Sequence, residues 1–117
     1  MIKSNKVIRD GKVAILISHG FGAGWYTWNT EFPDCLTNPR LVDLVAKLEI
    51  ARSAKQGVPQ IEQEIETLAK ELYGEGFYTG GVDDLTIHWV PEGTAFEVTE
   101  YDGAEGLTTT MSLPLVA

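Results

Sequence analysis

One stretch of the chain, residues 18–29, combines residue types suited to binding a small ligand. Glycines occupy alternate positions from Gly20 to Gly24, and three aromatic residues follow within the next four positions. Successive glycine amides can point at phosphate oxygens, and a tryptophan face can stack on a purine base. The stretch therefore predicts the wall of a site for a nucleotide-like ligand, formed by Phe21, Gly22, Ala23, Gly24 and Trp25.

The same stretch does not complete the motif of a known nucleotide-binding loop or of a hydrolase. Trp25 stands where the third glycine of a dinucleotide fingerprint would fall, and the lysine and hydroxyl of a phosphate loop are missing. The Gly-x-Ser-x-Gly motif of α/β-hydrolases is also absent. A plainer role for the aromatic residues, most of all Trp28, is to close the core or a subunit interface.

A second loop, residues 74–81, repeats the combination, with Phe77 and Tyr78 between pairs of glycines. The same alternatives apply to it, a stacking surface for a base or a part of the core. We include both aromatic residues in the predicted site because flexible glycines on each side suit a loop that encloses a ligand.

Three further residues have side chains that a nucleotide would need. Arg52 offers a positive charge, Asp83 could accept hydrogen bonds from ribose hydroxyls, and His88 could contact the ligand from a strand. Each also has a plainer role: a solvated helix residue, a turn or cap, and a half-buried strand histidine. The glutamates after residue 60 show no pairing typical of acid–base catalysis, so we predict a binding protein and no enzyme.

Charge and cysteine content exclude several partners. The net charge is −8, and residues 56–117 carry twelve acids and one base, so binding to a nucleic-acid polymer is disfavoured. Cys35 is the only cysteine, and His19 and His88 are the only histidines, so we predict no disulfide, no metal site and no cofactor. The sequence has no apolar run of membrane-spanning or signal-peptide length, which indicates a soluble intracellular protein without a membrane partner.

The hydrophobic pattern predicts one α+β domain over residues 1–117. Residues 13–17 are apolar at every position, so we expect a central strand covered on both faces. Asn38 and Pro39 are typical of the start of a helix, and Pro59 of the start of a second. The expected elements are strands at 6–9, 12–18, 85–90, 95–101 and 107–111 and helices at 39–55 and from 59. We expect an antiparallel sheet of about five strands with a helical pair packed on one face, and an apolar tail that docks on the sheet or on another subunit.

Several segments together resemble a family of small phage proteins, the first of the Thoeris anti-defence families. The resemblance spans nearly the whole chain and rests on Lys-Val-Ala-Ile-Leu (12–16), Gly-Phe-Gly-Ala-Gly-Trp-Tyr-Thr-Trp-Asn (20–29), Trp-Val-Pro-Glu-Gly-Thr (89–94) and Glu-Tyr-Asp-Gly (100–103). That family binds glycocyclic ADP-ribose isomers without degrading them, in pockets at a dimer interface, and its dimers assemble into hexamers. Some members also hold cyclic oligonucleotides at a separate site.

The resemblance implies that Phe77 or Tyr78, together with Arg52, contacts the ligand. A further arginine of the family's cyclic-oligonucleotide site has no counterpart, because no arginine follows Arg52. We therefore expect a homodimer or hexamer that sequesters a cyclic ADP-ribose-type signal in the cytoplasm of the infected bacterial host. The alternatives are a nucleotide-cleaving enzyme that uses Asp83, Asp84 or His88, and a protein-interaction inhibitor that acts through the aromatic loop.

Overall fold

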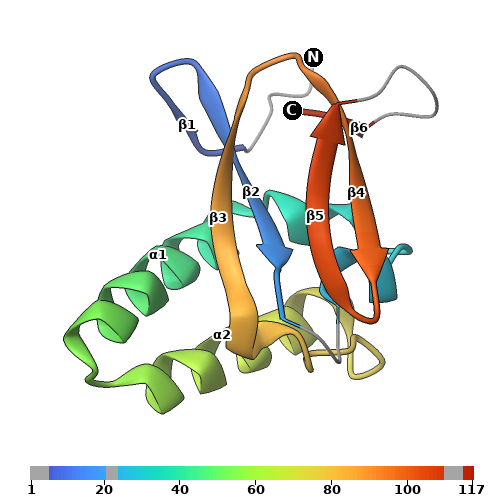
Figure 1. Ribbon diagram of the computed structural model, residues 1–117. Helices are drawn as coiled ribbons and strands as arrows, with labels where there is room; N and C mark the ends of the chain where they lie inside the picture. Colours follow the sequence, from blue (N-terminus) through green and yellow to red (C-terminus); the bar gives the residue numbers. More distant parts are fainter. Residues whose placement is uncertain (1–5, 21–23, 110–114) are drawn as a thin grey trace.

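The computed structural model describes residues 6–20, 24–109 and 115–117. Phe21, Gly22 and Ala23 of the predicted site lie outside the described residues. Figure 1 shows two helices beside a group of strands, and the elements follow in the order β1 (Ile8–Arg9), β2 (Lys12–Ser18), α1 (Pro39–Ala54), α2 (Val58–Tyr73), β3 (Leu85–Pro91), β4 (Ala95–Tyr101), β5 (Ala104–Thr109) and β6 (Leu115–Val116). Short 3₁₀ helices at Tyr26–Trp28, Pro33–Leu36 and Val82–Asp84 lie between them.

The fold is α+β as predicted, but the strands form two sheets and not one sheet of about five strands. In the described residues the first sheet has the order β1-β2-β3 and the second the order β5-β4-β6, with all pairs antiparallel. The chain leaves the first sheet after Pro91 at a turn that includes Gly93, whose φ of 84° suits glycine. β4 begins a new sheet and does not pair with β3.

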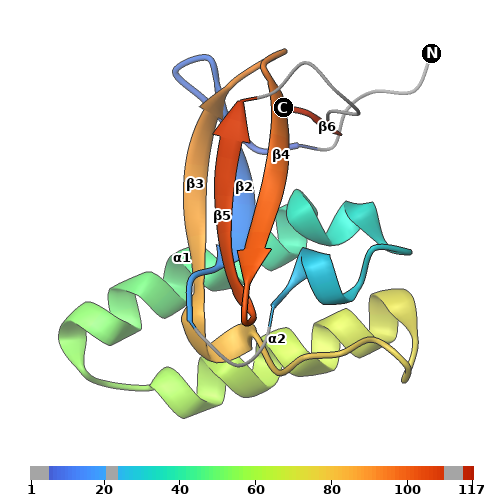
Figure 2. The ribbon, with the colours of Figure 1, turned by 45° about the vertical axis from the view of Figure 1, so that its right-hand side comes forward.

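Strand β2 is the centre of the molecule, and both of its faces are buried as its apolar sequence predicts. One face, with Ala14 and Leu16, packs in a core shared with α1 and α2. The other face, with Val13, Ile15 and Ile17, packs in a second core that includes residues of β4. The helix pair and the second sheet therefore lie on opposite sides of the first sheet, an arrangement that Figures 1 and 2 show from two directions.

Local signals in the sequence set the ends of several elements. The Asn38 side chain accepts hydrogen bonds from the amides of Arg40 and Leu41, which caps α1. Asp10 and Gly11 have φ angles of 50° and 74°, and Asp102 and Gly103 have 51° and 87°. Both dipeptides thus form the tight, left-handed turns that join antiparallel strands.

The apolar tail docks on the second sheet, which is one of the two outcomes expected for it. Leu115 and Val116 pair with Phe96 and Ala95 of β4, and Ala117 is buried in the second core. No helix among the described residues has the length and apolar character needed to cross a membrane.

Candidate functional site

The glycine-aromatic loop is held by a buried carboxylate that comes from the far end of the chain. Glu105, on β5, is 3% exposed, and its Oε2 accepts hydrogen bonds from the amides of Trp25 (2.9 Å) and Thr27 (2.8 Å) and from the Thr27 hydroxyl (2.7 Å). Its Oε1 accepts a fourth from the amide of Ser18 (2.9 Å). Backbone amides at both ends of the loop thus bind a carboxylate of the same chain, and they belong to Ser18, Trp25 and Thr27 and not to the glycines that were expected to contact a phosphate group.

A second polar residue, Asn29, joins the two glycine-aromatic loops. Its Nδ2 donates to the carbonyl oxygens of Trp25 (2.7 Å) and Tyr78 (3.0 Å), and its Oδ1 accepts from the Tyr78 amide (2.8 Å). Sequence reasoning missed Glu105 and Asn29. Their long-range contacts leave no local signal: one is a glutamate in an acidic half of the chain, and the other a polar residue after three aromatics.

The rings of Trp25 and Phe77, expected to stack on a ligand, lie in the core. Trp25 is 0% exposed and Phe77 2% exposed, and the two rings meet edge to face with centroids 5.0 Å apart. Trp25 Nε1 donates to the Cys35 carbonyl (2.8 Å), which satisfies the indole inside the core. Neither ring has a face open to a ligand, so the plainer role holds for both.

Each loop also has one aromatic ring at the surface, Trp28 in the first loop and Tyr78 in the second. Trp28 is 44% exposed and Tyr78 is 46% exposed, and their ring centroids lie 5.0 Å apart at an interplanar angle of 37°. Trp28, expected to close either the core or a subunit interface, does not lie in the core of the single chain. Tyr78 was part of the predicted site, and it lies at the surface where a partner can reach it.

Two of the glycines leave no room for a side chain: Gly81 lies against the backbone of the other loop, and Gly24 lies against the side chains of Thr27 and Trp28. A Cβ on Gly81 would lie 2.6 Å from the carbonyl oxygen of Gly24, and a Cβ on Gly24 would lie 2.4 Å from the Thr27 hydroxyl. Neither position has a positive φ. Close approach, and not an unusual backbone conformation, therefore explains these two glycines.

The close packing at Gly81 predicts that alanine substitutions at different glycines change the stability by different amounts. Gly81→Ala should lower the free energy of unfolding by about 1–3 kcal/mol, because a backbone carbonyl must move to admit the methyl group. Gly76→Ala is the control: its φ is not positive, and a Cβ there meets nothing within 4 Å. Urea denaturation measures both, and equal effects of the two substitutions would contradict the packing argument.

Arg52 and Asp83 are brought together, but by structural contacts. The Arg52 guanidinium donates to the carbonyl oxygens of Leu85 (2.6 Å) and Asp83 (2.7 Å), which ties α1 to the start of β3. Glu62 lies close by, and partial burial, followed by the Asp83 charge, raises the pKa of its carboxyl group. An arginine committed to two backbone carbonyls beside two acids is a poor receptor for a phosphate group.

His88 contacts a residue that was not in the predicted site. Its Nε2 meets the Nε2 of His19, with ring centroids 4.6 Å apart. Partial burial, followed by the charge of His19, lowers the pKa of His88.

A basic and aromatic surface lies elsewhere, on the β1–β2 hairpin and β3, and the sequence reasoning did not single it out. The Arg9 guanidinium carbon lies 5.5 Å from the centre of the Trp89 ring, which is 37% exposed. Two hollows adjoin this ring: one of about 150 Å³ reaches α1 at Asp43, and one of about 300 Å³ is lined by Arg9, Asp10, Lys12 and Trp89. We call Arg9, Lys12 and Trp89 the Trp89 surface.

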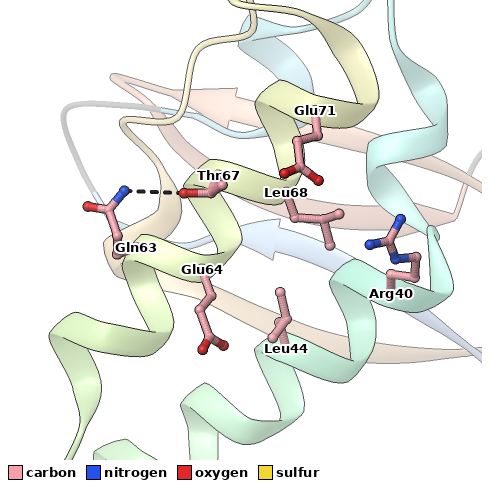
Figure 3. Close-up of a pocket in the computed structure, with 7 residues that line it drawn as sticks. All are labelled: Arg40, Leu44, Gln63, Glu64, Thr67, Leu68 and Glu71. Carbon is pink, nitrogen blue, oxygen red and sulfur yellow. Dashed lines mark hydrogen bonds between the residues drawn. The ribbon is translucent and has the colours of Figure 1, made fainter.

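Another hollow of about 310 Å³ lies between α1 and α2 (Figure 3). Arg40 and Leu44 line it from α1, and Glu64, Leu68 and Glu71 line it from α2. Its two carboxylates outnumber its one guanidinium, whereas the 300 Å³ hollow at the Trp89 surface has two bases and one acid. An anionic ligand therefore favours the Trp89 surface.

Comparison with known proteins adds no relative: no protein-family model, curated protein or solved structure matches the chain.

Proposed function

We propose that the protein is a phage anti-defence protein that binds a cyclic ADP-ribose-type signalling nucleotide and sequesters it without cleavage. The observation that carries this proposal is the Trp89 surface. It combines a guanidinium stacked on an indole, a second base and two adjoining hollows in a chain of net charge −8. A nucleotide of this class needs these three things: an aromatic face for its base, positive charge for its pyrophosphate and a concave surface.

The size of the hollows bears on the assembly. A site for a ligand of this size has a volume of roughly 300–1,000 Å³, and the larger hollow at the Trp89 surface, about 300 Å³, lies at the lower limit. We propose that a second copy of the chain closes the site, in a homodimer or hexamer in the cytoplasm of the infected host. A pocket shared between two copies agrees with the family that the sequence resembles.

Calorimetric titration with a panel of cyclic ADP-ribose isomers tests the proposal. One isomer should bind with a nanomolar dissociation constant, a binding free energy of about −12 kcal/mol. Such affinity is needed because a sequestering protein competes stoichiometrically with the host receptor. Trp89→Ala should weaken binding by about 5- to 150-fold, since a base–aromatic stack contributes about 1–3 kcal/mol. Arg9→Ala should also weaken binding. The control is Arg40→Ala, which removes an exposed base of α1 and should leave binding unchanged.

The fate of the ligand separates sequestration from catalysis. After binding, the protein is denatured by heat and the ligand is recovered. Intact ligand supports sequestration, and cleavage products would support the enzyme alternative. If both Trp89→Ala and Arg9→Ala leave tight binding unchanged, the nucleotide binds elsewhere and not at the Trp89 surface.

A second candidate function is inhibition of a host protein through the Trp28–Tyr78 pair. The observation that favours it is the exposure of both rings, 44% and 46%, on loops that two buried polar residues hold in place. Paired, rigid aromatic side chains are common anchors of protein interfaces. In this case Trp28→Ala would abolish inhibition of host defence, and no nucleotide of the panel would bind.

A further inference from the structure

His19 and His88 converge on one face of the first sheet. Their Nε2 atoms point at each other and are in contact, and the ring planes meet at 49°. His19 is exposed and His88 is half-buried, so solvent reaches the pair. These are the only two histidines of the chain.

The β2–β3 ladder positions the two rings. His88 is paired with Ile15, and Ser18 with Leu85, so His19 lies one residue beyond the ladder. Its amide donates to the Asp84 carbonyl (3.4 Å), which extends the antiparallel pairing by one step. His88 therefore lies on β3, and His19 directly follows β2 at the start of the glycine-aromatic loop.

We propose that His19 and His88 together bind a divalent transition-metal ion of the class that prefers imidazole ligands, Zn²⁺, Ni²⁺ or Cu²⁺. The neutral imidazole Nε2 is a common ligand for these ions, and the two rings already meet in the absence of a metal ion. Each Nε2 would lie about 2.0–2.1 Å from a zinc ion, so the rings must part slightly. The exposed ring of His19 has room to turn.

The coordination sphere is only partly supplied by protein. The described residues contain no group of three or more histidine, cysteine, aspartate or glutamate side chains that could hold a metal ion. Water or an oxygen-bearing ligand would therefore fill the remaining positions, as in sites that keep an open position. This proposal is independent of the Trp89 surface and of sequestration.

The test uses Zn²⁺ alone and protein prepared without a polyhistidine tag. Calorimetry of the wild type should show one saturable site per chain, and His19→Gln and His88→Gln should each weaken binding at least about tenfold. Mg²⁺, which prefers oxygen ligands, is the control for binding to the acidic surface. Binding that survives in the double variant, or equal binding of Mg²⁺, would overturn the proposal.

A second measurement does not depend on how the variants fold. Histidine ¹⁵N spectra of the wild type should show both Nε2 resonances shifting together as Zn²⁺ is added, with saturation at one equivalent. If neither nitrogen shifts, the two rings only share a hydrogen bond, and the proposed site is wrong.

Discussion

Replacing Glu105 by alanine should lower the free energy of unfolding by about 3–5 kcal/mol. Its buried carboxylate accepts four hydrogen bonds, from Ser18, Trp25 and Thr27, and the substitution leaves those donors without an acceptor. Each buried donor left without a partner costs about 1–3 kcal/mol, less where water enters. Denaturation in urea, followed by far-ultraviolet circular dichroism, measures the change.

Two further variants show which property of Glu105 matters. Glu105→Gln keeps the volume and one acceptor oxygen but turns an amide N–H₂ group toward backbone donors, so its effect should lie between those of the wild type and alanine. Glu97→Ala, at an exposed position of the neighbouring strand β4, should change the free energy of unfolding by less than about 0.5 kcal/mol. Equal stability of the Glu105→Ala and Glu97→Ala proteins would contradict the role given to the carboxylate.

The two tryptophans of the aromatic loop should respond very differently to truncation. Trp25→Ala should cost about 3–5 kcal/mol, since it removes a fully buried ring and its hydrogen bond to the Cys35 carbonyl. Trp28→Ala should cost less than about 1 kcal/mol, because Trp28 is 44% exposed and its ring contacts the exposed ring of Tyr78. The measurement is the same denaturation experiment.

Trp25→Phe provides a folded protein if the alanine variant does not fold. It keeps an aromatic ring against Phe77 but loses the donor to Cys35, so a loss of stability smaller than that of alanine is expected. The reverse order, with Trp28 the more costly to truncate, would show that the loop packs differently in solution.

The parts of the fold that the sequence predicts depend on neighbouring residues. Asn38 followed by Pro39 marks the start of α1, and Asp10-Gly11 forms the tight turn between β1 and β2. The unbroken apolar run of β2 likewise requires cover on both faces. These features were predictable because each depends on a few adjacent residues.

The features that were not predicted depend on contacts between distant segments. Strand β4 pairs with β5 and with the tail and not with β3, a choice that no local pattern expresses. Ser18 is 87 residues from Glu105, so the anion that fills the loop could not be inferred from the loop itself. The glycine content of the loop indicated amides that contact a ligand phosphate, whereas the amides that bind the Glu105 carboxylate belong to Ser18, Trp25 and Thr27.

The orientation of the aromatic residues also could not be predicted from the sequence, because it depends on contacts with distant segments. Trp25 and Trp28 are three positions apart in one loop, and the short 3₁₀ helix Tyr26–Trp28 separates a buried ring from an exposed one. Trp25 follows Gly24 and Trp28 precedes Asn29, and neither set of neighbours indicates which ring is buried. Only the packing of Phe77 and Cys35 against Trp25 decides which ring is inside.

The three tryptophans allow the most direct test of where a nucleotide binds. Trp25, Trp28 and Trp89 each give one indole N–H resonance in a ¹H–¹⁵N spectrum of the wild type, recorded while a cyclic ADP-ribose isomer is added. We predict a saturable shift of the Trp89 resonance, while that of Trp25, which is buried and donates to Cys35, stays in place. A saturable shift of Trp25 or Trp28 with Trp89 unmoved, or no shift at all, would contradict the proposed site.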